Sequence, residues 1–317
     1  MRRQIVLGGL LVVGVLSMTA AALQQPPKPS ASAIEVEKLA DNLFVLKALA
    51  AGGGGNTSVL VTANGVTVID TKNPGWGQPL LEKIKTLTPK PVTMIINTHT
   101  HGDHVSGNVE FPATVDVVVQ ENTKANMEAM RQPSFVPPPA SGPPPNIFTK
   151  NNGTGMAKRT FKDKMTIGSG ADRIDLFYFG PAHTNGDAMV FFPAARVLHM
   201  ADVFAAKGLP GMDSNNGGTG VGYTATLTKA ADFADKNNVE KIVSGHFNNT
   251  TTRAELREFI QYVGDFVKFA QDGKRSGKSV DEVTAAWKTP AKYAGYEAMP
   301  IPFRVKANVE LIYKETK

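Results

Sequence analysis

The chain has 317 residues, an apolar fraction of 42% and a net charge of +6. This length suits one large or two small domains, and the composition is ordinary for a soluble globular protein. Lysines are scattered rather than clustered, so we expect no nucleic-acid partner. The absence of cysteine excludes disulfides, cysteine metal ligands and lipid attachment to a cysteine after the leader.

The N-terminus has the features of an export signal. Arg2 and Arg3 precede an apolar run over residues 5–18, which small residues follow. The run is shorter than the roughly 20 residues that a membrane-spanning helix needs. We therefore expect a signal peptide at 1–22, with an uncleaved anchor as the alternative, and a flexible leader at 23–33. The mature protein would be periplasmic or secreted, with no stable membrane insertion after signal cleavage.

The first predicted elements are strands. Residues 34–46 alternate apolar and polar side chains, which is typical of one or two half-buried strands. Residues 57–62 and 66–70 are β-branched runs separated by Asn64-Gly65, a strong hairpin signal because this dipeptide accepts positive φ. We expect these two strands to pair antiparallel.

A strand–helix–strand unit follows the hairpin. Apolar residues over 80–87 have the helical period, and prolines at 89 and 91 end this helix. Residues 92–97 form a continuous apolar strand. A hairpin that leads into such a unit indicates a mixed sheet with helices packed on it.

The second half of the chain repeats this pattern. It predicts strands over residues 115–120, 174–179, 188–192, 196–200 and 241–244, and helices over residues 122–130, 224–237 and 252–270. Two such halves can stack as a sandwich of sheets with helices outside. Further helices are predicted over 280–287 and 305–313. We expect a catalytic domain over 34–270 and a helical C-terminal appendage over 271–317.

Two segments break the pattern. Residues 132–158 contain seven prolines and an Asn-Asn-Gly sequence, so we expect no regular secondary structure there. Residues 207–222 form a glycine-rich loop whose spacing does not match a nucleotide-binding loop. We expect these two loops to determine substrate specificity.

The strand over 92–97 ends in a segment rich in metal-binding residues. His99 and His101 are two residues apart on extended backbone, so their imidazoles point the same way and can bind one ion. Gly102 permits a turn that directs Asp103 and His104 towards a neighbouring ion. One short segment can therefore serve two metal ions.

Three more candidate ligands also follow predicted strands: His183, Asp202 and His246. Five of the six histidines thus come directly after strands. The order H-x-H-x-D-H, then His, Asp and His, resembles the metallo-β-lactamase superfamily over residues 35–259. This resemblance implies an α+β fold, the αββα sandwich of two mixed β-sheets with helices outside. It implies two metal sites, with His99, His101 and His183 at the first, Asp103, His104 and His246 at the second, and Asp202 bridging both.

The resemblance also implies a hydrolase with a small-molecule substrate. Two metal ions lower the pKa of a bound water, and Asp103 is the expected catalytic residue, which orients the water and shuttles its proton. A ligand set of imidazoles and carboxylates suits two Zn2+, with iron or manganese as alternatives. The bond cleaved is a thioester, a lactone or ester, or a β-lactam amide.

The sequence does not decide among these activities. Asp202 and the absence of cysteine bring the pattern closer to glyoxalase II-like thioesterases and lactonases, whereas export fits a β-lactamase better. The motif is also compatible with a single-iron persulfide dioxygenase that uses His99, His101 and His183, and with a binding module whose metal sites are silent. A nuclease would need a basic clamp, which the sequence does not show.

We predict roles other than metal binding for three further residues near these strands. His199 lies on the opposite face of its strand from Leu198 and Met200, so we expect it to pack or to support the site rather than bind metal. Asp187 is expected to shape the loop after His183. Tyr223 is a candidate for polarising a substrate carbonyl.

Overall fold

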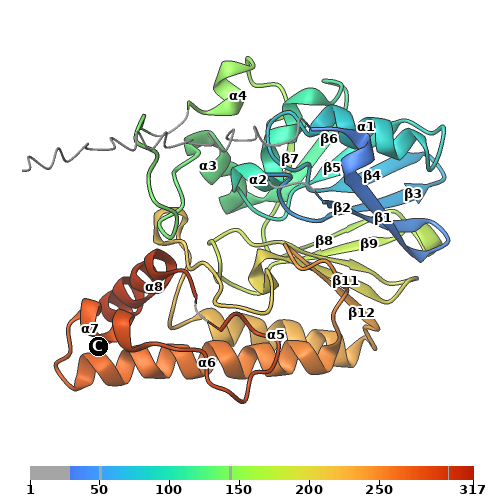
Figure 1. The fold of residues 1–317 in the computed structure, drawn as a ribbon. Coiled ribbons are helices and arrows are strands. Elements are labelled where there is room, and N and C mark those ends of the chain that lie inside the picture. The colour runs from blue at the N-terminus through green and yellow to red at the C-terminus, as the bar shows by residue number, and fades with distance from the viewer. Residues whose placement is uncertain (1–28, 50–51, 143–144, 299) are drawn as a thin grey trace, which may run out of the picture.

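Two stacked β-sheets lie between two layers of helices in the computed structural model (Figure 1). The structure describes residues 29–49, 52–142, 145–298 and 300–317, so the expected signal peptide lies outside the described residues. Helices α1 (Gly77–Lys85) and α3 (Glu121–Ala129) lie on the side of the first sheet, and α5 (Tyr223–Lys236) and α6 (Arg253–Arg275) cover the second. The αββα sandwich expected from the sequence is confirmed.

The first sheet has seven strands in sequence order. They are β1 (Ile34–Ala40), β2 (Leu43–Ala48), β3 (Thr57–Thr62), β4 (Gly65–Ile69), β5 (Val92–Ile96), β6 (Asp116–Gln120) and β7 (Arg159–Phe161). Strands β1 to β4 pair antiparallel and β4 to β7 pair parallel. The predicted hairpin is confirmed, since Thr62 pairs with Gly65 and Gly65 has φ of 147°.

The second sheet has five strands in the order β12, β11, β10, β9, β8. They are β8 (Lys164–Ile167), β9 (Ile174–Phe177), β10 (Met189–Phe192), β11 (Val197–Ala201) and β12 (Lys241–Ser244). Only β11 and β12 pair parallel; the other neighbours are antiparallel. The sequence did not predict β7 and β8, because these short strands have a single buried residue, Phe161, and lack the apolar run that marks the other short strands.

Strand alternation builds the core between and outside the sheets. Val45 packs between the sheets, whereas its neighbour Leu46 faces the helices outside the first sheet. In β11, Val197 likewise faces the first sheet and Leu198 faces the outer helices. All four side chains are buried, and burial of such a side chain stabilises a fold by about 1.5–3 kcal/mol. These apolar layers make the strands a rigid support for residues at their ends.

The remaining helices are α2 (Gly102–Val105), α4 (Ile147–Lys150), α7 (Val280–Ala286) and α8 (Pro302–Glu315). Helix α4 corrects the expectation that residues 132–158 have no regular structure: the Asn146 side chain caps one helical turn by accepting hydrogen bonds from two backbone amides. No helix among the described residues has the length and apolar character needed to cross a membrane.

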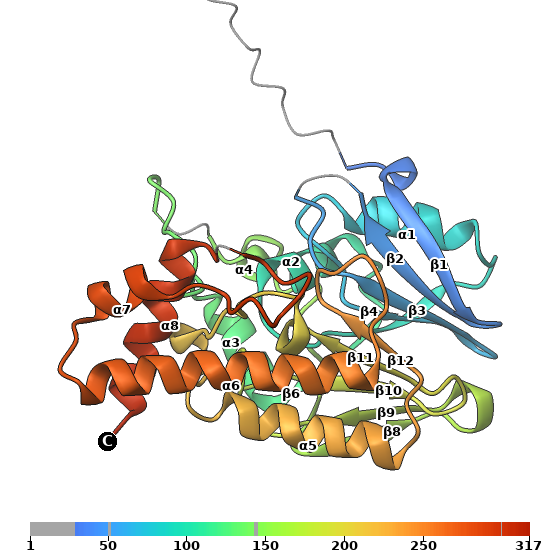
Figure 2. The same cartoon turned by 60° about the horizontal axis from the view of Figure 1, so that its bottom comes forward.

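The C-terminal helices pack on the end of α6 (Figure 2). Helix α6 begins at a capping box of Thr252 and Glu255 and continues to Arg275, past the domain boundary expected at residue 270. Val283 of α7 and Ile312 of α8 belong to the same buried apolar cluster as the inner faces of α5 and α6. The C-terminal segment therefore shares its core with the second sheet and its helices.

Candidate metal centre

The candidate ligands converge where the parallel strands end. Beyond β5, the backbone bends over residues 98–100 instead of staying extended as expected, and it turns into α2, which begins at Gly102. His99 and His101 therefore precede the turn, and Asp103 and His104 lie on it, as the sequence predicted. Loops after β9, β11 and β12 bring the other candidates to the same edge.

The first cluster consists of His99, His101 and His183. Their candidate ligand atoms all lie within 4.8 Å of one another. His101 Nδ1 is 2.9 Å from His183 Nε2, and His99 Nε2 is buried with no hydrogen-bond partner among the described residues. Three ring nitrogens thus face a common point inside the protein.

The second cluster consists of Asp103, His104 and His246, whose candidate atoms also lie within 4.8 Å of one another. His104 Nε2 is 3.4 Å from His246 Nε2. Asp103 Oδ2 is 3.3 Å from His246 Nε2 and 3.6 Å from His104 Nε2. This group is more open, since the side chains of His246 and Asp103 are 35% and 32% exposed.

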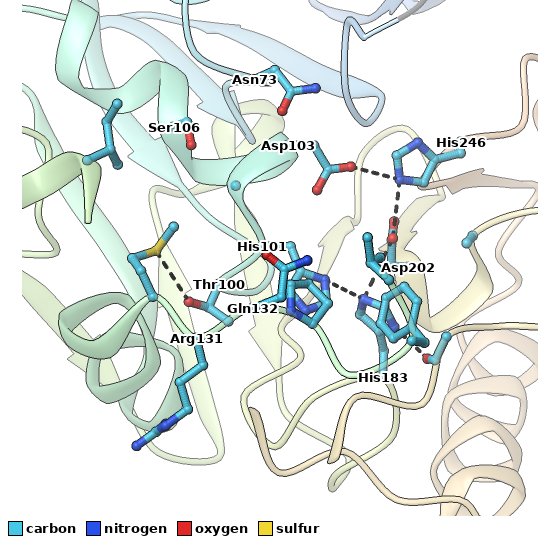
Figure 3. A pocket seen from close by; sticks show the side chains of 18 of the residues that line it. Asn73, Thr100, His101, Asp103, Ser106, Arg131, Gln132, His183, Asp202 and His246 are labelled. Carbon is cyan, nitrogen blue, oxygen red and sulfur yellow. Dashed lines mark hydrogen bonds and ion pairs between the residues drawn. The ribbon is translucent and has the colours of Figure 1, made fainter. Parts of the chain in front are cut away.

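Asp202 lies between the two clusters (Figure 3). Its Oδ1 is 3.3 Å from His104 Nε2, and its Oδ2 is 3.2 Å from His246 Nε2 and 3.7 Å from His183 Nε2. Gly245 leaves room for this carboxylate, because a Cβ at that position would lie 1.9 Å from Asp202 Oδ1. The structure therefore brings all seven predicted residues together.

In four of the five candidate histidines, the ring nitrogen that faces away from the clusters has a hydrogen-bond partner. These contacts are His99 Nδ1 with Thr98 Oγ1 (3.0 Å), His101 Nε2 with Asp213 Oδ2 (2.8 Å), His104 Nδ1 with Asp70 Oδ2 (2.7 Å) and His183 Nδ1 with the Gly211 carbonyl (2.7 Å). A hydrogen bond on one nitrogen sets the tautomer and orients the ring, so the other nitrogen presents its lone pair to a metal.

Sequence reasoning missed Asp70 and Asp213 as supports of the site. Asp70 directly follows β4. Its Oδ1 accepts a hydrogen bond from the Thr98 amide, and its Oδ2 accepts one from the Thr98 hydroxyl and faces His104 Nδ1. The signal for Asp70 was its position, an acidic residue at the end of a buried strand. Asp213 lies in the glycine-rich loop, where the sequence offers no comparable signal.

The electrostatics of the two clusters favour bound cations. Burial and the nearby His101 lower the pKa of His183 to about 4, and burial also lowers the pKa of His99, so both imidazoles are neutral at pH 7. Burial lowers the pKa of His246 too, but Asp202 and Asp103 outweigh it and raise the pKa to about 10. Neutral imidazoles are the form that binds metal, and the carboxylates attract positive charge to the second cluster.

The donor set fits two divalent cations. Inward-facing nitrogens and the buried Asp202 Oδ1, which has no hydrogen-bond partner among the described residues, leave lone pairs that a cation would satisfy. Asp70, His99 and His104 also have candidate atoms within 4.8 Å of one another, but both Asp70 oxygens are engaged by Thr98 and His104. Imidazole and carboxylate ligands suit zinc, iron and manganese.

A cavity of about 650 Å³ opens onto the clusters. His101, Asp103, His183, Asp202 and His246 are part of its lining (Figure 3). The proline-rich loop, residues 132–158, supplies an apolar wall that includes Phe135 and Val136. A drug-sized ligand fits a cavity of this volume, since such sites measure about 300–1,000 Å³.

The structure also shows where the three further residues named in the sequence analysis lie. His199 lies between the sheets, where its Nδ1 is 2.8 Å from Ser58 Oγ. Asp187 accepts hydrogen bonds from the amide and hydroxyl of Thr184, so it shapes the loop after His183 as expected. The expectation for Tyr223 is wrong: this side chain is fully buried, and its hydroxyl donates to the carbonyls of Asp202 and Val203 instead of facing the cavity.

An αββα sandwich with paired His/Asp clusters at one edge defines a class of metal-binding protein. The family model of the metallo-beta-lactamase superfamily matches residues 50–246. The chain belongs to this superfamily.

The chain is also similar to curated relatives and to solved structures. The chain is 27% identical to "Metallo-beta-lactamase type 2" of Elizabethkingia meningoseptica over 250 residues, which cover 75% of this chain and 86% of that protein. It is 28% identical to "2,4-dinitroanisole O-demethylase subunit alpha" of Nocardioides sp. (strain JS1661) over 141 residues, 44% of this chain and 38% of that one. The fold is similar to the metallo-beta-lactamase from Pontibacter korlensis, with a TM-score of 0.56, 20% identity and coverage of 73% of this chain and 99% of that one.

Proposed function

We propose that the chain is a binuclear zinc hydrolase that cleaves a carbonyl compound, with β-lactam amides as the first substrates to test. The observation that carries this proposal is the position of Asp202, whose two oxygens face both clusters. In this proposal His99, His101 and His183 hold one ion, Asp103, His104 and His246 hold the second, and Asp202 contacts both.

Two divalent cations would polarise the carbonyl and supply hydroxide at neutral pH. The protein positions the reactants. Asp103 lines the cavity and is partly exposed, so its carboxylate can accept a hydrogen bond from the attacking water and pass on the proton. Phe135 and Val136 of the proline-rich loop lie along the cavity, where they exclude water and hold the apolar part of a substrate.

The choice of β-lactams rests on similarity and on the cavity. The Elizabethkingia relative is named a metallo-beta-lactamase and aligns with 75% of this chain. A cavity of about 650 Å³ accepts a bicyclic amide. A single-iron dioxygenase would need only the first cluster, and the second cluster with its Asp202 contacts favours two ions.

Metal stoichiometry and hydrolysis test this proposal on the purified mature protein. We expect two zinc ions per chain and hydrolysis of a chromogenic β-lactam, with an aryl lactone and a thioester assayed in parallel. If only the lactone or the thioester is hydrolysed, the protein is still a metal-dependent hydrolase, but its substrate is an ester or a thioester and not a β-lactam. One iron ion per chain together with oxygen consumption would overturn the proposal.

We further propose that residues 1–22 direct export and that the mature enzyme works in the periplasm or outside the cell. The order of two arginines, an apolar run and small residues supports this. N-terminal sequencing of protein from the periplasmic fraction is expected to begin near Leu23. Full-length protein in the cytoplasmic fraction would contradict it.

A further inference from the structure

Helix α8 brings a cationic side chain to the wall of the cavity. Arg304 lies in the first turn of α8 and lines the same cavity as His101, His183 and Asp202. It lies outside the residues that the family model matches, 50–246. The family match therefore gives Arg304 no role.

The Arg304 side chain is held in a defined position. Its Nη1 donates a hydrogen bond of 3.1 Å to the Leu209 carbonyl, and the guanidinium carbon lies 5.8 Å from the ring centre of Phe135. The Phe135 ring in turn lies 5.7 Å from the His101 ring and 5.5 Å from the His183 ring. Arg304 is thus separated from the first cluster by one aromatic ring.

The helix that carries Arg304 is fixed to the glycine-rich loop. One turn further along α8, the buried Asn308 side chain donates to the Pro210 carbonyl at 2.8 Å and accepts from the Met212 amide at 3.1 Å. Arg304 bonds Leu209 of the same loop. The guanidinium therefore has a fixed place on the cavity wall, which reduces the entropy that ligand binding would cost.

The charge of Arg304 has no counter-ion among the residues that the structure describes. Across the described ranges, no carboxylate oxygen lies within 4.0 Å of its guanidinium, and its Nε is buried without a hydrogen-bond partner. The bond to Leu209 is the single hydrogen bond that the structure gives this side chain. A partly buried, unpaired cation is unfavourable, and a bound anion would compensate it.

We propose that Arg304 binds a carboxylate of the substrate, so that the enzyme acts on anionic carbonyl compounds with an apolar body. A guanidinium matches a carboxylate in geometry and charge. Met130, Phe135 and Ile147 supply apolar surface in the same cavity. This inference rests on the proposed function and names the substrate class of that site.

Paired substrates test the role of Arg304. A chromogenic β-lactam with a free carboxylate and its uncharged methyl ester are assayed on the zinc-loaded wild type, Arg304→Met, Arg304→Lys and Lys306→Met. A hydrogen bond between charged groups changes affinity by a factor of about 10–100. Arg304→Met should therefore lower kcat/KM for the acid by about 10–100-fold. The same variant should lower kcat/KM for the ester by less than about threefold. Arg304→Lys should recover part of the loss.

Lys306→Met is the matched control, because it removes one positive charge from the exposed face of the same helix, where Lys306 pairs with Asp281. It should leave both substrates unaffected. Equal losses for acid and ester in Arg304→Met would assign Arg304 a structural role only and overturn the inference. An unchanged preference for the acid would overturn it as well.

A binding measurement separates this inference from the proposed function. Calorimetric titration of the zinc-loaded protein with 3-phenylpropanoate and with 3-phenylpropanamide needs no turnover. We expect the wild type and Lys306→Met to prefer the acid, and Arg304→Met to lose about tenfold or more of that preference. If Arg304→Met loses the preference for the acid but the wild type hydrolyses no carbonyl substrate, the proposed hydrolase function is rejected and the anion site is retained. Equal preferences for the acid in all three proteins would reject the anion site.

Discussion

The carboxylate of Asp213 lies 2.8 Å from Nε2 of His101, and the other nitrogen of that ring faces His183. The second oxygen of Asp213 accepts hydrogen bonds from the amides of Ser134 at 2.9 Å and Asn215 at 3.0 Å. One buried carboxylate therefore orients a candidate metal ligand and links the proline-rich loop to the glycine-rich loop. We therefore expect Asp213 to affect both the metal affinity of the first cluster and the order of these two loops.

Asp213→Asn is expected to weaken zinc binding at the first cluster by about 10–100-fold, because it removes the anion that orients and polarises His101. Competition with a chromophoric chelator measures the affinity. Asp163→Asn, a change of the same size and charge at an exposed position, is the control and should bind zinc as the wild type does. Wild-type affinity in Asp213→Asn would show that the contact does not support the metal.

The sequence predicted the candidate ligands because the information was local. Four of them lie within six residues after a strong apolar strand, so they lie close together in space wherever that strand ends. His183, Asp202 and His246 were placed by their order after strands. The structure brings these residues within contact distance because the parallel strands end at one edge.

The supporting residues could not be predicted because their contacts span long distances in sequence. Asp213 and His101 are 112 positions apart, and the loop around Asp213 has no period that would fix its direction. The direction of the Tyr223 side chain could not be predicted either. A tyrosine near the site can face the cavity or the core, and the packing of α5 directs this one to the core. The position of Arg304 at the cavity could not be predicted because it depends on where α8 packs.

Asp103→Asn tests the catalytic residue. It keeps the size of the side chain and removes the charge that accepts a proton from water, so we expect kcat to fall by about 100-fold or more. The assay should be run at saturating zinc, with metal content measured on the same sample, so that loss of the second ion is separated from loss of proton transfer. Unchanged turnover would contradict the proposed mechanism.

Ala201 precedes Asp202 in an unusual backbone conformation, with φ of 44° and ψ of −130°. Such a conformation costs a residue with a Cβ about 1–3 kcal/mol, and glycine adopts it without that cost but loses about 0.5–1 kcal/mol through its freer unfolded chain. The substitution also removes the buried Ala201 methyl group, which costs about 0.8 kcal/mol. Ala201→Gly should therefore raise the free energy of unfolding by about 0.5 kcal/mol, measured by urea denaturation. Ala195→Gly, at a turn without positive φ, should not stabilise the protein. A loss of stability in Ala201→Gly would show that the surrounding packing relieves the strain.

Lys72 gives the protein a pH-dependent stability. Its ammonium group is fully buried and donates to the carbonyls of Leu46 at 3.1 Å and Gly55 at 2.6 Å. Burial lowers its pKa to about 7, although Asp70 and Asp103 act in the opposite direction. In the unfolded chain the pKa returns to 10.5. Between these two values the unfolded state binds one more proton, so the free energy of unfolding rises with pH by up to about 1.4 kcal/mol per unit.

Lys72→Met removes this titration. The difference in free energy of unfolding between wild type and Lys72→Met should therefore increase from pH 7 to pH 9.5, because only the wild type gains stability from its neutral Lys72. Urea denaturation at saturating zinc, at half-unit pH steps, measures this difference. Lys306→Met, at an exposed site, should show a constant difference from wild type across the same range. Parallel pH profiles for wild type and Lys72→Met would show that Lys72 keeps its proton in the folded protein, which would place the pKa of the buried amine well above 7.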